Sequence, residues 1–264
     1  MWWIDKLTPE AFSEGFGLTT PMLSGELKVH RYYSYFDKAV STMKRLMIKQ
    51  CNVVDEGALK VLNGVLSLGE IYRMAGGDFW VVVPCVGDKT KEIMEGTRLT
   101  LQKHAGEQGG EGSYDFSIRT PGTPERWEQF SKEFDKLWEE DVKEAIEGCS
   151  GRVDLVQVSL KVFYYWVHFA PLTRGSAAVG HGMMLSLLRA GGKEMRLGGG
   201  QLEGVQLDWE AILRSDADEF VSAWSGWLRG TLVDIASADV HACASVASSL
   251  PDLKSRVCAL TGFD

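Results

Sequence analysis

Residues 163–192 read FYYWVHFAPLTRGSAAVGHGMMLSLLRAGG, and this stretch of the sequence decides the fold. The apolar run that leads into it has no continuous polar face, which predicts a helix from about Arg152 to Phe169 with neighbours on every side. A second helix is expected from about Gly175 to Ala190, where two glycines end it. The sequence therefore predicts a pair of central helices over about 152–191.

The turn between these helices carries Thr173, Arg174, Gly175 and Ser176. The first N–H groups of a helix have no internal partners and carry partial positive charge, so a helix start favours anions. Arg174 would neutralise a phosphate or carboxylate, and Ser176 would donate a hydrogen bond. The alternative stays open: Arg174 pairs with a structural carboxylate, and the small residues serve helix packing.

Two histidines, His168 and His181, flank the turn. Imidazole is the usual general base near neutral pH, so either residue is a candidate catalytic base. The alternative is that His168 is hydrogen-bonded within a core helix and that His181 packs or lies on the surface. The five histidines form no HExxH or carboxylate cluster, so no metal site is expected.

Composition limits the class of protein. The chain has 264 residues, 45% apolar and 24% charged, with a net charge of −8. This is ordinary globular composition, and the negative charge argues against nucleic-acid and membrane partners. Five cysteines without a CxxC pair predict free thiols in the cytoplasm or another reducing intracellular compartment. No secretory signal is expected from the N-terminal residues.

A β-hairpin is expected in the first half of the chain. Residues 97–102 and 114–119 alternate polar and apolar, and four glycines lie between 106 and 112. This predicts two strands with a flexible tip, a flap of about 94–119. Arg98 and Arg119 lie on these strands, where they would contact a ligand under the flap. The alternative is that both belong to the solvated face of a ribbon.

Residues 79–83 are β-rich and end at Pro84. Most of the remaining chain reads as helices. Three helices are expected at about 8–15, 34–50 and 55–74, and a fourth begins after the cap at Thr123 and ends at about 147. Another helix is expected after a capping box at Ser215, and two short helices near the C-terminus. The tryptophans are expected in the core rather than as cofactor stacks. The sequence predicts one domain, residues 1–264, mainly α with a small β-hairpin insert.

Five motifs carry a resemblance that covers most of the chain: DFWVVVPC at 78–85, MEGTRLTLQK at 94–103, FSIRTPGTPERW at 116–127, HFAPLTRGSAAVG at 168–180 and VQLDWEAIL at 205–213. Together they resemble the C-terminal region of certain eukaryotic tetratricopeptide-repeat proteins, of the plant immune-suppressor type. Here the region is expected to stand alone, without repeats. The resemblance implies a eukaryotic, intracellular protein and carries no reaction.

A more distant resemblance rests on the order of elements. A hairpin flap, a buried helix, an anion-binding turn and a second helix resemble the Fic/Doc (Fido) fold, whose members move AMP or another phosphate-containing group onto a protein hydroxyl. His168, Phe169, Arg174 and Gly175 match that family's histidine–arginine turn in part. The turn lacks the family's asparagine and its acidic metal-binding residue. The resemblance implies a Fido-like helical arrangement with the reaction lost or replaced.

Two functions follow from the sequence. The first is an intracellular domain that binds a phosphate- or carboxylate-bearing small molecule, such as a nucleotide, at the Arg-Gly-Ser turn and acts as a group transferase. The second is a non-catalytic module that binds a protein partner and keeps the turn for structure. No cofactor is named by the sequence. A pocket with convergent polar groups would favour the first, and a turn closed by its own side chains would favour the second.

Overall fold

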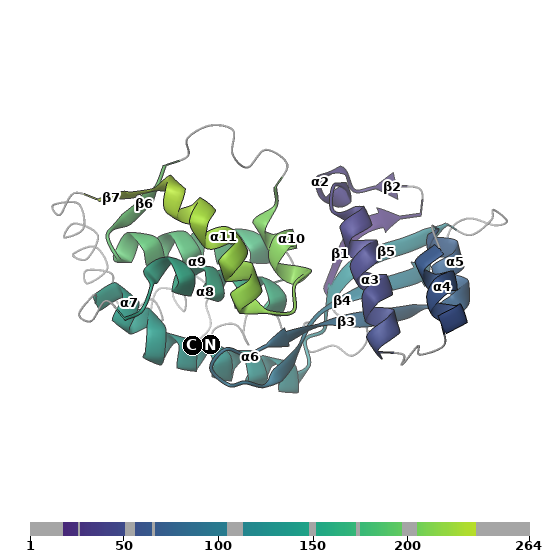
Figure 1. Ribbon diagram of the computed structural model, residues 1–264, viewed down its shortest axis with the longest axis horizontal. Helices are drawn as coiled ribbons and strands as arrows, with labels where there is room; N and C mark the ends of the chain where they lie inside the picture. The colour runs from purple at the N-terminus through teal and green to yellow at the C-terminus, as the bar shows by residue number, and fades with distance from the viewer. Residues whose placement is uncertain are drawn as a thin grey trace, which may run out of the picture.

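A computed structural model describes residues 18–25, 27–50, 56–64, 67–104, 113–147, 152–172, 175–196 and 205–235. Within these residues the chain forms a sheet with helices beside it and a second, mostly helical half (Figure 1). The sheet is antiparallel, in the order β2-β1-β5-β4-β3. Its strands are β1 (Leu18–Ser24), β2 (Leu27–Lys28), β3 (Phe79–Val86), β4 (Ile93–Lys103) and β5 (Tyr114–Thr120).

Helices account for most of the remaining described residues. Beside the sheet lie α2 (His30–Tyr33), α3 (Phe36–Gln50), α4 (Glu56–Gly64) and α5 (Leu68–Ala75). The other half contains α6 (Pro124–Leu137), the π-helix η2 (Trp138–Val142), α7 (Lys143–Glu147), α8 (Leu155–Phe169), α9 (Ser176–Ala190), α10 (Leu207–Ile212) and α11 (Ala217–Thr231). A small ribbon, β6 (Lys193–Met195) with β7 (Leu232–Asp234), joins α9 to α11.

The fold class expected from the sequence is wrong. The chain is mixed α/β, and the arrangement is not shown to be Fido-like. The predicted hairpin exists as β4 and β5, but β5 also pairs with β1 and β4 also pairs with β3, so both strands lie inside a sheet. The sequence hides this because β1 carries Pro21 in a seven-residue strand, and proline normally argues against a strand.

One face of the sheet is apolar and packs against α3. Leu99 pairs with Ile118 and Leu101 pairs with Phe116 across β4 and β5. All four side chains are buried, and the ring of Phe36 on α3 meets Phe116 edge-on at 5.6 Å. This burial is what holds α3 on the sheet.

The edge strand β3 is protected by a side chain. Gln50, the last residue of α3, donates its amide to the carbonyl of Val82 and accepts from the N–H of Val82. Pro84, two residues further along, has no N–H to offer. An unpaired strand edge can pair with a strand of another chain, and both the Gln50 hydrogen bonds and Pro84 make such pairing less favourable here.

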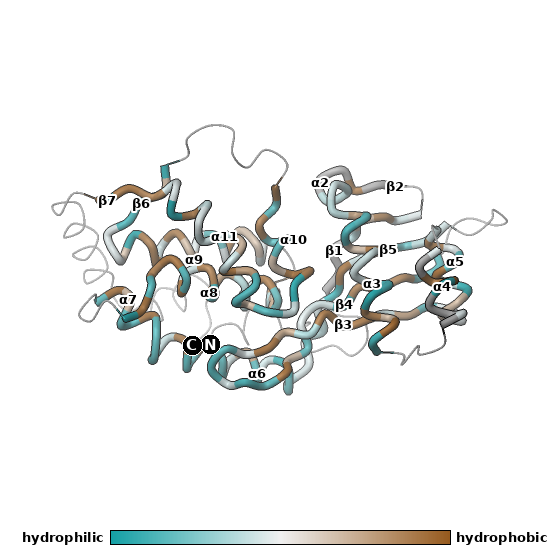
Figure 2. Tube along the Cα trace, viewed as in Figure 1, coloured by the Kyte–Doolittle hydropathy of each residue, from teal (hydrophilic) through white to brown (hydrophobic). Residues whose placement is uncertain are grey.

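The helical half is built around α8, as the sequence predicts. Trp166 and Phe163 are 1% and 2% exposed, so the predicted burial of this helix is confirmed. Hydrophobic residues concentrate on α8 and on its neighbour α9 (Figure 2). Asp154 caps the start of α8 by accepting from two N–H groups of the first turn, which fixes where the helix begins.

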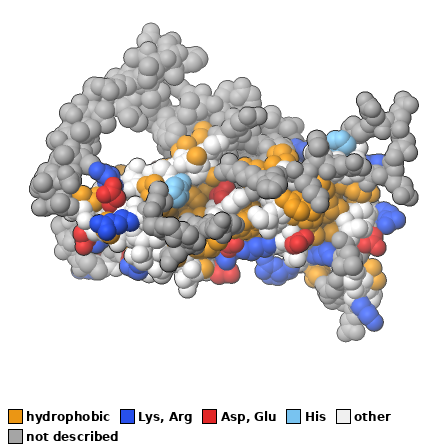
Figure 3. All heavy atoms as spheres, turned by 90° about the horizontal axis from the view of Figure 1, so that it is seen from above, with side chains coloured by type: hydrophobic (Ala, Val, Ile, Leu, Met, Phe, Trp, Pro, Cys, Tyr) orange, Lys and Arg blue, Asp and Glu red, His pale blue; other side chains and the backbone are white. Residues whose placement is uncertain are grey.

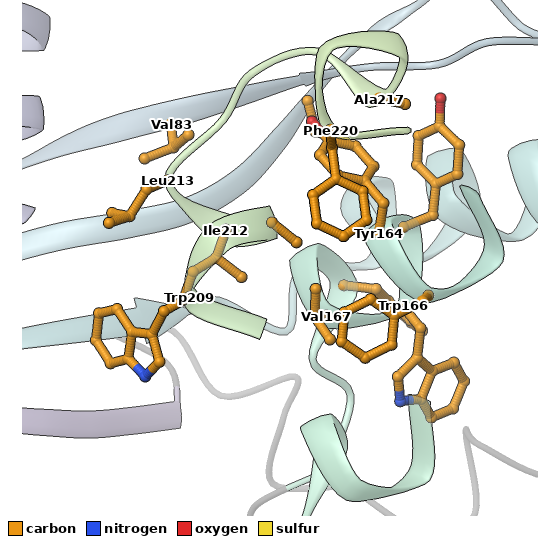
Figure 4. Packing of buried hydrophobic residues seen from close by; sticks show 14 of the residues in the cluster. Val83, Tyr164, Trp166, Val167, Trp209, Ile212, Leu213, Ala217 and Phe220 are labelled. Atoms are coloured by element: carbon orange, nitrogen blue, oxygen red, sulfur yellow. The ribbon is translucent and has the colours of Figure 1, made fainter. Parts of the chain in front are cut away.

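Helix α10 joins the two halves. Figure 4 shows Leu213, which follows α10, beside Val83 of β3, and Phe220 of α11 beside Tyr164 of α8. The rings of Tyr164 and Phe220 lie 5.7 Å apart. The sheet, α8 and α11 therefore share one buried cluster around α10.

The predicted helix boundaries hold in part. Thr123 caps α6, and Pro124 follows in its first turn. The expected helix over 55–74 is two helices, because Ser67 starts a new one with a capping box. Asp216, and not Ser215, caps α11. The predicted helices at 8–15 and near the C-terminus, and nearly all of the hairpin tip, lie outside the described residues.

Candidate functional site

The predicted anion-binding turn is described only at its second half, because Thr173 and Arg174 lie outside the described residues. Gly175 caps α9 in the left-handed conformation at φ 82°, which glycine adopts most readily. The Ser176 hydroxyl accepts from the N–H of Leu172 and donates to its carbonyl oxygen, both at 3.1 Å. Ser176 therefore closes the turn on itself instead of offering its donor to a ligand.

His168 lies in the core, fully buried. Its Nε2 lies 3.1 Å from the carbonyl oxygen of Ala211 and 3.0 Å from that of Arg214, so Nε2 carries the proton and donates to both. Burial lowers the pKa of His168 to about 3, so the ring stays neutral near pH 7. This geometry favours a role in joining α8 to the end of α10 and to Arg214, which follows it.

His181 lies elsewhere, on α9. Its ring is half-buried and meets the ring of Phe163 edge-on at 6.4 Å, and burial lowers its pKa. The described contacts of the two histidines are with different residues: His168 faces α10, and His181 packs on α8. Their assignment as candidate bases stays a prediction.

Arg98 and Arg119 stand directly opposite each other on β4 and β5. Arg98 pairs with Glu95 and lies over the ring of Trp80 at 4.9 Å. Arg119 donates to Gln102 at 2.6 Å, and burial lowers its pKa. Both belong to the sheet, whereas the Ser176 turn belongs to the helical half (Figure 1). Any ligand role for the two arginines stays a prediction.

Sequence reasoning missed Arg126, the most enclosed cation among the described residues. Its guanidinium is fully buried and donates to five main-chain carbonyls: those of Glu95, Gly96, Pro121, His168 and Phe169. Burial lowers its pKa to about 10. The carbonyls of His168 and Phe169 lie at the C-terminal end of α8, where the helix dipole favours a positive charge. Arg126 thus joins β4, α6 and α8 structurally.

Sequence reasoning also missed a groove between α6–η2–α7 on one side and α9 on the other. Its volume is about 770 Å³, within the usual range of ligand pockets. The lining is almost wholly apolar: Phe134, Asp135, Trp138, Val142, Ile146, Val162, Trp166, Val179, Gly182, Met183, Ser186, Leu187 and Ala190. Trp138 and Val179, on opposite walls, are 48% and 38% exposed, so the groove opens to solvent.

The π-helix aligns one wall of the groove. Phe134, Trp138, Val142 and Ile146 follow one another at intervals of four residues. In an α-helix each such step turns the side chain by roughly 40°, so the row would drift off the groove. In η2 the Lys143 N–H bonds to the Trp138 carbonyl, five residues back, and this wider turn reverses part of the drift.

Two glycines on α9 show which side of this helix is packed. A Cβ at Gly180 would lie 2.7 Å from the ring of Trp166, so α9 approaches α8 closely there. A Cβ at Gly182 would meet nothing within 4 Å, and Gly182 lines the groove. Helix α9 is therefore packed tightly on α8 at Gly180 and has open space at Gly182.

Acidic residues gather on the wall formed by α6, η2 and α7. Residues 135–147 contain six acids and two lysines, a net charge of −4, half of the chain's −8. Lys143 is paired with Glu139, and Asp141 is paired with Lys89. Asp135 itself lines the groove. The apolar lining is thus bordered by negative charge.

Other kinds of site are not evident in the described residues. They contain no group of three or more His, Cys, Asp or Glu that could hold a metal. Among them, no helix is long and apolar enough to cross a membrane. Seen from above, the described side chains on that face mix apolar, basic and acidic types (Figure 3).

Comparison with known proteins gives two relatives. The chain is 34% identical over 249 residues, 87% of its length, to Suppressor of RPS4-RLD 1 of Arabidopsis thaliana. It is 25% identical over 244 residues, 86% of its length, to Tetratricopeptide repeat protein 13 of Homo sapiens. These stretches are 23% and 27% of the relatives, so the chain spans about a quarter of each. No family model and no solved structure matches.

These relatives support the expected relationship to tetratricopeptide-repeat proteins and to a plant suppressor protein, and both come from eukaryotes. The expected link to the Fic/Doc family has no support. That the matching region is C-terminal in the relatives stays a prediction.

Proposed function

We propose that this chain is a non-catalytic protein-interaction module, and that the groove between α6–η2–α7 and α9 receives an apolar segment of the partner. The observation that carries the proposal is the groove itself, an apolar hollow of about 770 Å³ with Trp138 and Val179 exposed on its two walls. Exposed apolar surface of this kind costs free energy unless a partner covers it.

The turn before α9 supports the same choice. The Ser176 hydroxyl is bonded to the main chain of Leu172, and the Ser176 carbonyl accepts from the indole N–H of Trp166 at 2.8 Å. Because these groups are bonded to one another, they are not offered to a ligand, and this favours the interaction module. Binding of a phosphate- or carboxylate-bearing ligand, with group transfer, stays an untested alternative because it depends on Arg174.

The relatives add a weaker argument. One is named as a tetratricopeptide-repeat protein, and such repeats form extended surfaces that bind other proteins. A region that accompanies such repeats would add a further contact for partners. A reducing compartment, cytoplasmic or other, remains part of the proposal.

A photo-crosslinking experiment tests the proposed function. Benzoylphenylalanine replaces Val179 in the groove and, as a control, Val61 on α4, which is the more exposed of the two valines. We expect a protein that crosslinks from position 179 and not from 61, and that binds the purified parent chain. Its affinity should fall in Gly182→Leu, which fills the groove. Equal crosslinking from both positions, or unchanged binding to Gly182→Leu, would contradict the proposal.

A further inference from the structure

We infer that the partner segment is an amphipathic helix with leucine-like residues on one face and lysine or arginine beside them, an inference that rests on the proposed function. Three features of the groove lead to it: its length, its lack of open main-chain groups and its charge.

The groove has the length of a short helix. Its lining on α9 runs from Val179 to Ala190, twelve residues separated by eleven steps, which is about 16 Å at roughly 1.5 Å per step. That is about three turns of a partner helix, enough for apolar residues at i, i+3 or i+4, and i+7. The opposite wall, from Phe134 to Ile146, is of similar length.

The walls favour a helix over an extended peptide. They are helices, whose main-chain N–H and C=O groups are bonded internally, and no strand edge is among the described residues that line the groove. An extended peptide would bury its own main-chain groups against apolar side chains without hydrogen-bond partners, which is unfavourable. A helix satisfies its main chain and offers only side chains.

The charge around the groove favours basic flanks. Asp135 lines it, and residues 135–147, which form most of this wall, carry a net charge of −4. On the other wall, the described lining of α9 has no charged residue. A segment with lysines next to its apolar face would meet opposite charge, whereas one with glutamates would meet like charge.

Model peptides test the inference directly. Three labelled peptides of about 18 residues carry leucines on one helical face and lysines, glutamines or glutamates on the other. Fluorescence anisotropy measures their binding to the parent chain at low and high salt. We expect the lysine peptide to bind at least about tenfold more tightly than the glutamate peptide, and to weaken as salt rises.

Two matched glycine variants show where the peptides bind. Gly182→Leu fills the groove, whereas Gly226→Leu, on α11, also extends into open space but lies outside the groove lining. Melting temperatures and circular dichroism check that both variants fold. We expect Gly182→Leu to weaken binding of the lysine peptide at least about tenfold, and Gly226→Leu to leave it unchanged.

A charge variant completes the design. Asp135→Asn should weaken binding of the lysine peptide several-fold, and Asp37→Asn, an exposed control on α3, should not. Three peptides with equal affinity, all lost in Gly182→Leu, would overturn the basic partner and leave the proposed function standing. The inference would also be overturned if the lysine peptide bound Gly182→Leu as tightly as the parent chain, or if it did not bind the parent chain at all. The proposed function is tested separately, by the crosslinking experiment.

Discussion

Two regions that border α8 differ in whether their side chains are enclosed or open to solvent. At the end of α8, the junction with the sheet holds Arg126 and His168, whose donors are all directed at main-chain carbonyls. Along the side of α8, the groove leaves Trp138 and Val179 exposed. The comparison teaches that Arg126 and His168 direct their donors inward at main-chain groups, whereas the groove leaves apolar side chains open to solvent.

The packing around glycines gives the same contrast. At the junction, a Cβ on Gly96 would lie 2.4 Å from the Val83 carbonyl and 2.7 Å from Nδ1 of His168. In the groove, a Cβ on Gly182 would meet nothing within 4 Å. A site that tolerates no added atom has no room for a ligand, so the junction is unsuited to binding and the groove is suited to it.

The largest effect is expected at the junction. Arg126→Ala leaves five buried carbonyls without their donor, and each unsatisfied group costs about 1–3 kcal/mol. We expect the free energy of unfolding to fall by more than about 4 kcal/mol in urea titrations. Arg189→Ala, which breaks only an exposed pair with Glu194, should change it by less than about 1 kcal/mol. A loss below about 2 kcal/mol for Arg126→Ala would contradict the structural role.

The second effect depends on pH. The pKa of His168 is lowered to about 3 in the folded chain, against about 6.5 when unfolded. Between these values the unfolded chain binds the extra proton, so stability falls as pH falls below about 6.5. The slope is at most about 1.4 kcal/mol per pH unit. Burial lowers the pKa of His181 as well, which adds a slope of the same sign.

Comparison with His168→Gln isolates that contribution. The unfolding free energies of the parent and the variant are measured by urea denaturation at pH 7, 6 and 5. The parent should lose more stability than His168→Gln over this range, because the variant has no proton to bind at this position. Parallel pH dependences would show that His168 titrates normally and is accessible, which would return it to consideration as a base.

The third effect contrasts two glycines on one helix. Gly180→Ala should lower the free energy of unfolding by about 1–3 kcal/mol, because its methyl meets the Trp166 ring, which a hydrogen bond to Ser176 holds in place. Gly182→Ala should raise it by about 0.5–1 kcal/mol, since alanine favours a helix and nothing obstructs it. Thermal or chemical denaturation of both variants measures the sign of each change in the free energy of unfolding. If both substitutions changed the free energy of unfolding in the same direction, Gly180 and Gly182 would not differ in packing as described.

Sequence reasoning found what local pattern determines. The all-round apolar character of residues 155–169 predicted the central helix, and Thr123 with Pro124 predicted the start of α6. It predicted the strands β4 and β5 and the β-rich residues of β3, but not that they form one sheet with β1. The pairing of β1 with β5 joins residues about a hundred positions apart, and no local alternation signals it.

The site was harder to predict for a related reason. Arg126 follows a helix cap and looks like an ordinary surface residue, and only the folded chain brings its five carbonyls together. The groove has one local signal, apolar residues at 134, 138, 142 and 146. Read as an α-helix this row drifts around the axis, and the π-helix that straightens it is not visible in the sequence.

The smallest effect on stability is expected at Trp138, where the effect on binding should be large. Its side chain is 48% exposed, so Trp138→Ala should change the free energy of unfolding by no more than about 1 kcal/mol. Trp166→Ala, at the closed floor of the same groove, should cost about 3–5 kcal/mol. Exposed aromatic side chains that a partner buries are common hot spots, so Trp138→Ala should weaken the lysine peptide at least about tenfold. If Trp138→Ala lowered the free energy of unfolding strongly and left peptide binding unchanged, the contrast between junction and groove would be reversed. The groove wall would then be part of the core.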